Sequence, residues 1–246
     1  AGNVKDPSQQ VLHAAADGSR VGAMIAFDLA HDDLGSATRT STNQADWDHR
    51  YGTEPMWSGN PNGSLVDQLA GLTPGRALDI GAGEGADAIW LAEQGWKVTA
   101  TDISRRALDR MSAEADLRGL DIEASVADAN AASPYGEFDL VTAMYASIPR
   151  TADRRGVNNI LAAVAPDGTL LVVSHDLAPM QKPVDTKTES RAFDPDAYVR
   201  VEDFAAAMEG DPAWSVEVHE LRPRPRGSAT DDLHVDDLVF RARRTA

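Results

Sequence analysis

A cluster of glycine and acidic residues is the part of the sequence best suited to binding a ligand. Gly81, Gly83 and Gly85 follow a short apolar stretch, and Asp79 lies two residues before the first of them. Glycine lets the backbone approach a ligand closely and adopt positive φ angles, and the first turn of a following helix offers unpaired N–H groups. These residues therefore predict a binding loop between a strand and a helix.

Two further acidic residues stand where an adenosine ligand needs hydrogen-bond acceptors. Asp102 ends the next predicted strand, where its carboxylate could accept hydrogen bonds from both ribose hydroxyls. Asp128 follows the third predicted strand, where it could accept a hydrogen bond from an adenine amino group. Ligands of open α/β sheets bind at the carboxyl ends of the strands. Each acid alone could be a helix cap or a solvated loop residue, but their recurrence at successive strand ends favours an adenosine site.

The charge of the loop discriminates between two classes of adenosine cofactor. The spacing G-x-G-x-x-A over residues 81–86 also suits a dinucleotide. The carboxylate of Asp79, however, would make no favourable interaction with the two negative phosphates of a dinucleotide. A carboxylate instead favours the cationic sulfonium and ammonium groups of S-adenosylmethionine (SAM). The sequence therefore predicts SAM as the cofactor, and an NAD(P)-dependent oxidoreductase is the alternative.

Three residues near the predicted ends of the fourth and fifth strands are candidates for catalysis: His175, Asp176 and Tyr145. Methyl transfer from a sulfonium is an in-line displacement of an activated donor, so positioning can suffice, and some enzymes add a general base for an O–H or N–H nucleophile. His175 suits that role best, because histidine exchanges protons near neutrality. The competing interpretations are a histidine that satisfies loop backbone and a Tyr145 that belongs to the cofactor pocket.

The remaining predicted pocket residues flank these positions. Tyr51 and Trp57, together with Trp47, precede the domain and could form a lid that excludes water, or could merely pack the linker onto the sheet. Met144 is expected to pack near the adenine. The residues predicted to bind the cofactor are Asp79, Gly81, Ala82, Gly83, Gly85, Asp102, Ile103, Asp128, Ala129, Met144, Tyr51 and Trp57.

Charged residues near the C-terminus allow two other interpretations. His219, His234, Asp236 and Asp237 could suggest a metal cluster, but alternate residues of a strand face opposite ways, so no metal site is predicted. The basic run 222–226 is expected to be a solvated loop, with contact to an acidic substrate as the alternative.

The elements expected to position these residues alternate along the chain. Apolar stretches predict strands at 76–80, 96–101, 122–126, 138–143 and 170–173, and helical periodicity predicts helices at 65–69, 84–94, 104–118 and 157–164. Pro166-Asp167-Gly168 predicts a turn before the fifth strand. Such alternation gives a mostly parallel sheet with helices on both faces. Two later stretches, 214–221 and 235–241, predict an antiparallel C-terminal strand pair.

The composition restricts the function. The chain has 246 residues, a net charge of −16 and no cysteine. Nucleic-acid binders usually need a basic face to release counterions, so a small-molecule substrate is favoured over DNA or RNA. No apolar run approaches the roughly 20 residues of a membrane helix. We expect a cytoplasmic protein with an N-terminal extension over 1–45, helical in part and ending in a linker, and a single domain over 46–246.

Several motifs resemble those of class I SAM-dependent methyltransferases. Residues 78–85 are similar to the first motif of that family, and Asp102, Asp128, residues 138–141 and residues 166–170 fall where it has its later motifs. Within the class, the chain most resembles small bacterial enzymes related to tellurite-resistance methyltransferases. The residues that carry this second likeness are 47–51, 57–61, 87–92 and 175–176.

The resemblance implies a Rossmann-like α/β fold and methyl transfer to the O, N, S or metalloid atom of a small molecule. A protein that binds SAM without methylating is the alternative within the same fold. Ala82 departs from the pattern, since many relatives carry Cys there, but the backbone does the binding at this position. The resemblance does not cover the first 45 residues, which could contribute to a homodimer contact.

Overall fold

The computed structural model describes residues 43–56, 58–131, 135–176, 197–225 and 236–245. Trp57, His234, residues 177–196 and most of the predicted extension lie outside these residues. The strands are β1 (Arg76–Ile80), β2 (Lys97–Asp102), β3 (Ile122–Val126), β4 (Phe138–Met144), β5 (Val164–His175), β6 (Trp214–Pro223) and β7 (Asp236–Arg244). The helices are α3 (Gln44–Arg50), α4 (Gly63–Leu69), α5 (Ala86–Glu93), α6 (Arg105–Arg118), α7 (Arg155–Ala162) and α8 (Val201–Met208).

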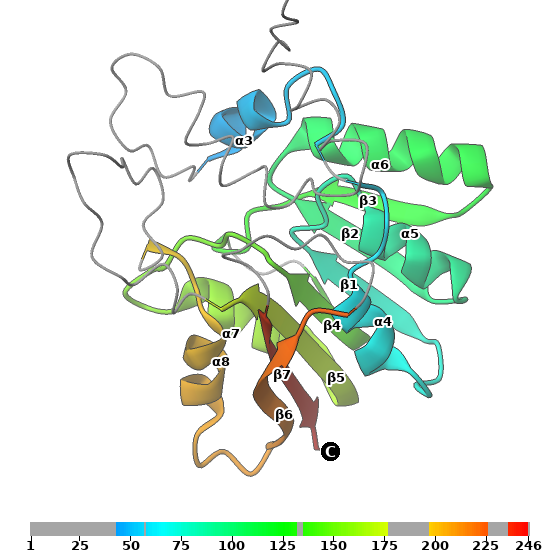
Figure 1. Ribbon diagram of the computed structural model, residues 1–246. Helices are drawn as coiled ribbons and strands as arrows, with labels where there is room; N and C mark the ends of the chain where they lie inside the picture. The colour runs from blue at the N-terminus through cyan, green and yellow to red at the C-terminus, as the bar shows by residue number, and fades with distance from the viewer. Residues whose placement is uncertain (1–42, 57, 132–134, 177–196, 226–235, 246) are drawn as a thin grey trace, which may run out of the picture.

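One seven-stranded sheet in the order β3-β2-β1-β4-β5-β7-β6 organises the molecule (Figure 1). The first five strands of this order run parallel, β7 pairs antiparallel with β5, and β6 pairs antiparallel with β7. The strand order reverses between β1 and β4, and a crevice for ligands forms at such a point, outside the carboxyl ends of the strands. The predicted fold class is therefore confirmed.

Two apolar cores, one on each face of the sheet, hold the helices in place. On one face Leu65 of α4, Leu91 of α5 and Met111 of α6 pack against sheet residues. On the other face Val157 of α7 and Phe204 of α8 do so. Figure 1 shows the same division, with α4, α5 and α6 on one side and α7 and α8 on the other. Among the described helices, none combines the length and the apolar character that crossing a membrane requires.

The predicted strands coincide closely with the observed ones, but three local predictions were wrong. Helix α5 begins at Ala86 rather than at residue 84, because Gly85 has a φ of 85° and cannot continue a helix. Residues 166–168 do not separate two elements: they lie within β5, where its register against β4 shifts between Phe138 and Leu140. Helices α3 and α8 were not predicted, although Val201, Phe204 and Met208 form the buried face of α8.

Gly85 fixes the end of the binding loop, and its replacement by alanine is expected to cost about 3 kcal/mol or more of unfolding free energy. A Cβ atom at Gly85 would lie 2.0 Å from Cγ of Met111, in addition to the positive φ. Gly119, which ends α6 with a φ of 68°, is a matched control because a Cβ atom there meets nothing within 4 Å. Gly119→Ala should cost only about 1–2 kcal/mol. Equal losses in urea denaturation would show that the Met111 contact is unimportant.

Candidate functional site

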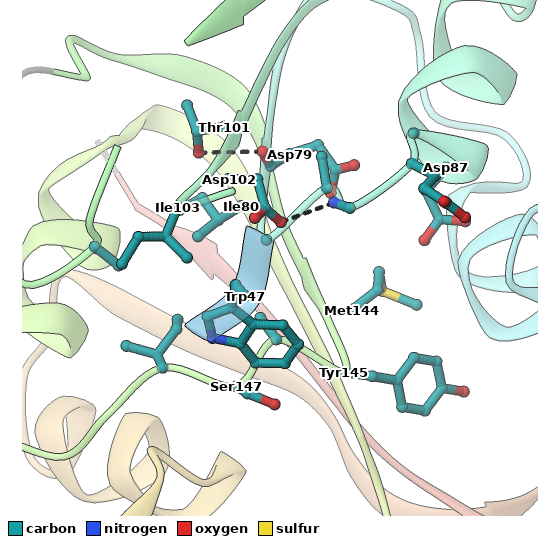
Figure 2. Close-up of a pocket in the computed structure, with 18 of the residues that line it drawn as sticks. Trp47, Asp79, Ile80, Asp87, Thr101, Asp102, Ile103, Met144, Tyr145 and Ser147 are labelled. Carbon is teal, nitrogen blue, oxygen red and sulfur yellow. Dashed lines mark hydrogen bonds between the residues drawn. The ribbon is translucent and has the colours of Figure 1, made fainter. Parts of the chain in front are cut away.

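A cavity of about 240 Å³ opens at the carboxyl ends of β1, β2 and β4 (Figure 2). Helix α3 and the segment that follows it contribute the opposite wall through Trp47, Arg50 and Tyr51. Of the residues predicted to form the site, those lining the cavity are Tyr51, Asp79, Gly81, Ala82, Gly83, Gly85, Asp102, Ile103, Asp128, Ala129, Met144, Tyr145 and His175. Asp176 is not among the lining residues; its backbone N–H donates to the Asp236 carbonyl.

The glycine loop turns between β1 and α5 because three of its residues adopt backbone angles that favour glycine. The φ angles of Gly81, Gly83 and Gly85 are 70°, 57° and 85°. The N–H groups of Gly81 and Ala82 both donate to the Thr101 carbonyl, at 2.8 and 3.0 Å. The loop is thus tied to the end of β2, which holds it against the cavity.

Asp102 connects the glycine loop to the start of α6. Its Oδ2 accepts a hydrogen bond from the Gly83 N–H at 2.9 Å, and its Oδ1 accepts one from the Ser104 N–H at 2.8 Å. The residue is 8% exposed, and burial raises the pKa of its carboxyl group above the ordinary value. Each carboxylate oxygen can accept a second hydrogen bond, so Asp102 can still accept bonds from a ligand in the cavity.

Asp79 and Asp87 form a pair of buried carboxylates that also line the cavity. Asp79 is 2% exposed, and its Oδ1 accepts a hydrogen bond from Oγ1 of Thr142 at 2.8 Å. Burial, reinforced by the nearby Asp87, raises the pKa of Asp79 to about 8. The two oxygens of Asp87 accept hydrogen bonds from the backbone and side-chain nitrogens of Asn62, at 2.7 and 2.6 Å, while burial raises the pKa of Asp87. Buried acids at such proximity favour a cationic ligand.

Asp87 was not predicted as a site residue. An acidic residue in the first turn of a helix commonly interacts with the positive end of the helix dipole, so its presence there can be explained without a ligand. In the structure Asp87 lines the cavity, and its partner Asn62 lies just before α4, far from it in the sequence. Asp128 lines the cavity as predicted, but it is exposed and its Oδ1 accepts a hydrogen bond from the Asn130 N–H at 2.8 Å, as a loop-capping residue would.

Tyr145 and His175 form the wall at the ends of β4 and β5. Their rings stack with centroids 4.5 Å apart and an angle of 29° between the planes. Tyr145 has a φ of 53°, unusual for a bulky residue, and its N–H donates to the Val173 carbonyl. Burial and the neighbouring carboxylate of Asp237 raise the pKa of the Tyr145 hydroxyl far above its ordinary value. The raised pKa keeps the proton on the Tyr145 hydroxyl near neutral pH, which disfavours Tyr145 as the general base.

A buried ion pair stands behind this wall. The side chains of Arg224 and Asp237 are 2% and 1% exposed, and Nε of Arg224 donates to Oδ1 of Asp237 at 2.8 Å. Oγ of Ser64 donates to the other Asp237 oxygen at 2.7 Å. The guanidinium carbon of Arg224 lies 5.0 Å from the centre of the Tyr145 ring, and Nη2 lies 3.4 Å from Nδ1 of His175.

The prediction of a solvated basic loop at 222–226 was wrong for Arg224. The run of alternating Arg and Pro gave no indication of burial, because the partner carboxylate lies on a different strand. The register of β7 places Asp237 opposite both His175 of β5 and Arg222 of β6, and Arg224 follows β6 directly. The pairing of β6 with β7 therefore brings Arg224 next to Asp237. The spacing of these residues in the sequence did not predict this contact.

Comparison with known proteins identifies the domain that carries this cavity. Residues 77–168 match the family described as methyltransferase domain. The ubiquinone biosynthesis O-methyltransferase of Aromatoleum aromaticum is 36% identical over 101 residues, which cover 40% of this chain and 43% of that protein. The chain carries a SAM-dependent methyltransferase domain. The prediction of SAM, rather than a dinucleotide, as the cofactor is confirmed.

Solved structures agree with the methyltransferase fold. The N-methyltransferase NodS from Bradyrhizobium japonicum, in complex with S-adenosyl-L-homocysteine (SAH), superposes with a TM-score of 0.61 at 20% identity, covering 83% of this chain and 100% of NodS. TehB from Haemophilus influenzae superposes with a TM-score of 0.53 at 18% identity, covering 82% of this chain and 67% of TehB. The predicted resemblance is thus confirmed. The chain spans about half the length of the curated relatives that it matches first, at 51% of a Mycobacterium tuberculosis protein.

Helix α3 precedes the matched residues 77–168, and polar contacts hold it and the segment after it beside α6 and the glycine loop. Oδ1 of Asp48 accepts hydrogen bonds from Oγ of Ser104 at 2.6 Å and from the Arg106 N–H at 3.1 Å. Arg110 donates to the carbonyls of Gly52 and Glu54 and pairs with Glu84 of the loop. Figure 2 shows Trp47 in the same cavity as Asp102 and Met144. The contacts of α3 and the position of Trp47 are consistent with the predicted lid over the cofactor cavity.

Removing this tether should weaken the binding of SAM. Arg110→Ala deletes the hydrogen bonds to the segment after α3, so the ligand must order that segment at its own cost, and we expect an affinity about fivefold to tenfold lower. Arg118 on the same helix is the control, because it pairs only with exposed Glu93 and Glu114. Calorimetric titration with SAM checks both variants. An unchanged dissociation constant in Arg110→Ala would contradict the role assigned to the tether.

His219, Asp236 and Asp237, which could suggest a metal cluster in the sequence, lie on β6 and β7. His219, once considered for a metal cluster, packs edge-on against Phe240 with ring centroids 5.4 Å apart. Within the parts of the chain that the structure describes, no group of three or more His, Asp or Glu side chains is placed to hold a metal ion.

Proposed function

We propose that this protein transfers a methyl group from SAM to a small-molecule acceptor by in-line displacement. The observation that carries the proposal is the set of three buried carboxylates, Asp79, Asp87 and Asp102, around one cavity in a methyltransferase domain. Such a set suits a cofactor with a ribose, an ammonium group and a sulfonium.

Several residues that line the cavity have a proposed role in binding SAM. Asp102 accepts hydrogen bonds from the ribose hydroxyls, while Asp79 and Asp87 face the cationic end of the cofactor. The glycine loop lines the cavity, so its backbone lies close to the cofactor. The adenine packs among Ile103, Ala129, Met144 and the Asp128 carboxylate, and Tyr51 closes the site.

Positioning and desolvation carry most of the catalysis in this proposal. SAM supplies an activated methyl group, so the protein needs to align the acceptor in line with the breaking C–S bond and to exclude water. Tyr145 and His175 line the cavity, and in this proposal they contact the acceptor. Asp176, which does not line the cavity, has no direct role in this mechanism.

A small-molecule acceptor fits both the composition and the relatives. The net charge of −16 disfavours a polyanionic substrate. One relative, from Mycobacteroides abscessus, is a 2-heptyl-1-hydroxyquinolin-4(1H)-one methyltransferase, 29% identical over 137 residues. The atom methylated is an O, N, S or metalloid atom. We place the protein in the cytoplasm of a bacterium, where SAM is available, with a homodimer as one arrangement of the full chain.

The decisive experiment combines cofactor binding with a methyl-release assay over a panel of O, N, S and metalloid acceptors. SAM and SAH should raise the melting temperature, NAD should not, and at least one acceptor class should turn over. Firm SAM binding without turnover of any acceptor would instead favour a protein that uses the fold for binding alone. Binding of NAD in preference to SAM would overturn the proposal.

A further inference from the structure

Strand β6 is the last strand of the sheet, and its outer edge is open (Figure 1). The strand pairs antiparallel with β7 along its inner edge. Over residues 218–223 its backbone forms no hydrogen bond to a described residue outside β7. The strand is ten residues long, whereas β3 at the opposite end of the sheet has five. Unpaired N–H and C=O groups along such an edge are a template for pairing with a further strand.

Apolar side chains are exposed on this strand. Val216 is 48% exposed and Leu221 is 52% exposed, and they are two of the four large apolar side chains that the described residues expose. Their partners on β7 belong to the core beneath α7 and α8, so both side chains lie on that face of the sheet. A bulge between Val216 and Val218 bends the strand, which leaves residues 218–223 as its regular part.

The charges of β6 and β7 balance one another. The two strands together carry four acidic and four basic residues, in a chain whose net charge is −16. A neutral pair of strands offers no net attraction to a strongly charged partner. It does let two copies of an acidic chain approach with little repulsion at the point of contact. The charge distribution therefore favours a second copy of this chain as the partner of the edge.

The regular part of β6 is complementary to itself in one register. Residues directly opposite each other in an antiparallel pair lie on the same face, so a two-fold axis perpendicular to the sheet must pass through a residue. With the axis at Leu221, the two Leu221 side chains meet on one face. On the other face, Glu220 of each copy lies opposite Arg222 of the other. An axis at Glu220 or at Arg222 would instead place like charges opposite each other.

Glu220 and Arg222 already form an ion pair within one copy. Nε of Arg222 lies 2.5 Å from Oε1 of Glu220, and their side chains are 41% and 55% exposed. Across the axis, two such pairs would join into an alternating group of four charges. Groups of this kind contribute more to stability than an isolated surface pair does.

We propose that the outer edge of β6 pairs with β6 of a second copy of this chain, antiparallel and centred on Leu221. Two seven-stranded sheets then become one continuous sheet. The pairing extends over residues 219–223 of each copy. Because this contact is small, the dimer should be weak, with a dissociation constant on the order of 10 μM. The inference assigns a surface to the homodimer and does not depend on methyl transfer.

A single introduced cysteine tests the contact directly, because the chain has none of its own. In Leu221→Cys the two thiols face each other across the axis, at a Cα separation that a disulfide spans. Mild oxidation should convert most of this variant into a disulfide-linked dimer. Leu117→Cys is the control, because Leu117 is 83% exposed but lies on α6, and it should stay largely monomeric. No cross-link in Leu221→Cys, or equal cross-linking in both variants, would overturn the proposal.

The register is tested by exchanging charges and measuring the dimer by sedimentation equilibrium, with folding checked by circular dichroism. Arg222→Glu brings four carboxylates together and should weaken the dimer about tenfold or more, whereas adding Glu220→Arg restores opposite charges and should return the affinity to within about threefold. Arg155→Glu is the control, because Arg155 is exposed at the start of α7 and pairs with Asp153. It should leave the dimer unchanged.

A natural protein that stays monomeric up to about 200 μM would overturn the proposal, because a dimer of the expected affinity is then largely formed. So would a double variant as weak as Arg222→Glu alone. These measurements need no cofactor and no acceptor. A failure of methyl transfer would therefore leave the proposed dimer standing, and a monomeric protein would leave the proposed function standing.

Discussion

Replacing Asp102 with alanine is expected to weaken the binding of SAM about 100-fold or more. The carboxylate is proposed to accept hydrogen bonds from two ribose hydroxyls, and a hydrogen bond to a charged group contributes about 1.5–3 kcal/mol. The same change also frees the N–H groups of Gly83 and Ser104, which Asp102 now binds, so the glycine loop should lose its fixed position. Both effects act in the same direction.

Calorimetric titration with SAM and with SAH checks this prediction. The ribose is common to both ligands, so Asp102→Ala should weaken them by similar factors. Asp128→Ala is the matched control, because that carboxylate is exposed and caps its own loop, and its loss should cost less than about tenfold. A selective loss of SAM with SAH unaffected would show that Asp102 senses the sulfonium and not the ribose.

The sequence predicted the cofactor side of the site because its determinants are local. The glycine loop, Asp79 and Asp102 all stand at the ends of strands that hydrophobic patterning identifies, and parallel strands bring those ends to one edge of a sheet. Tertiary pairing was needed to bring β1 and β2 together, and these strands do pair in parallel.

The acceptor side was harder to predict, because its determinants depend on partners far apart in the sequence. Arg224 and Asp237 meet only through the pairing of β6 with β7, and Ser64 reaches Asp237 from α4. Viewed alone, an Arg–Pro run indicates a solvated loop. Helix α8 was missed for a similar reason, since its short buried face becomes evident only against the core beneath it.

The affinity of the protein for SAM is expected to rise with pH and to level off above about pH 8. Burial and the nearby Asp87 raise the pKa of Asp79 to about 8 in the free protein, so Asp79 is largely protonated at pH 6. The sulfonium and ammonium groups of SAM favour the ionised carboxylate. Binding must then release a proton, and the dissociation constant should increase by up to about tenfold for each pH unit below 8.

Asp79→Asn separates this effect from the ionisation of the ligand itself, because the amide oxygen can still accept the hydrogen bond from Thr142. The variant should bind SAM weakly with a flat pH profile, and it should lose less affinity for SAH, which lacks the sulfonium charge. A profile as steep in Asp79→Asn as in the natural protein would assign the titration to another group.

The same ionisation predicts an opposite effect on the stability of the free protein. A carboxyl group whose pKa is higher in the folded state stabilises the fold fully below its unfolded pKa, and this stabilisation is lost as the pH rises through the folded value of about 8. Asp79→Asn never acquires the buried charge. The ligand-free variant should therefore melt several degrees higher than the natural protein at pH 8 and show a smaller difference at pH 5. Because the carboxylate that binds the cofactor destabilises the empty site, saturating SAM should reverse the order of the two melting temperatures at pH 8.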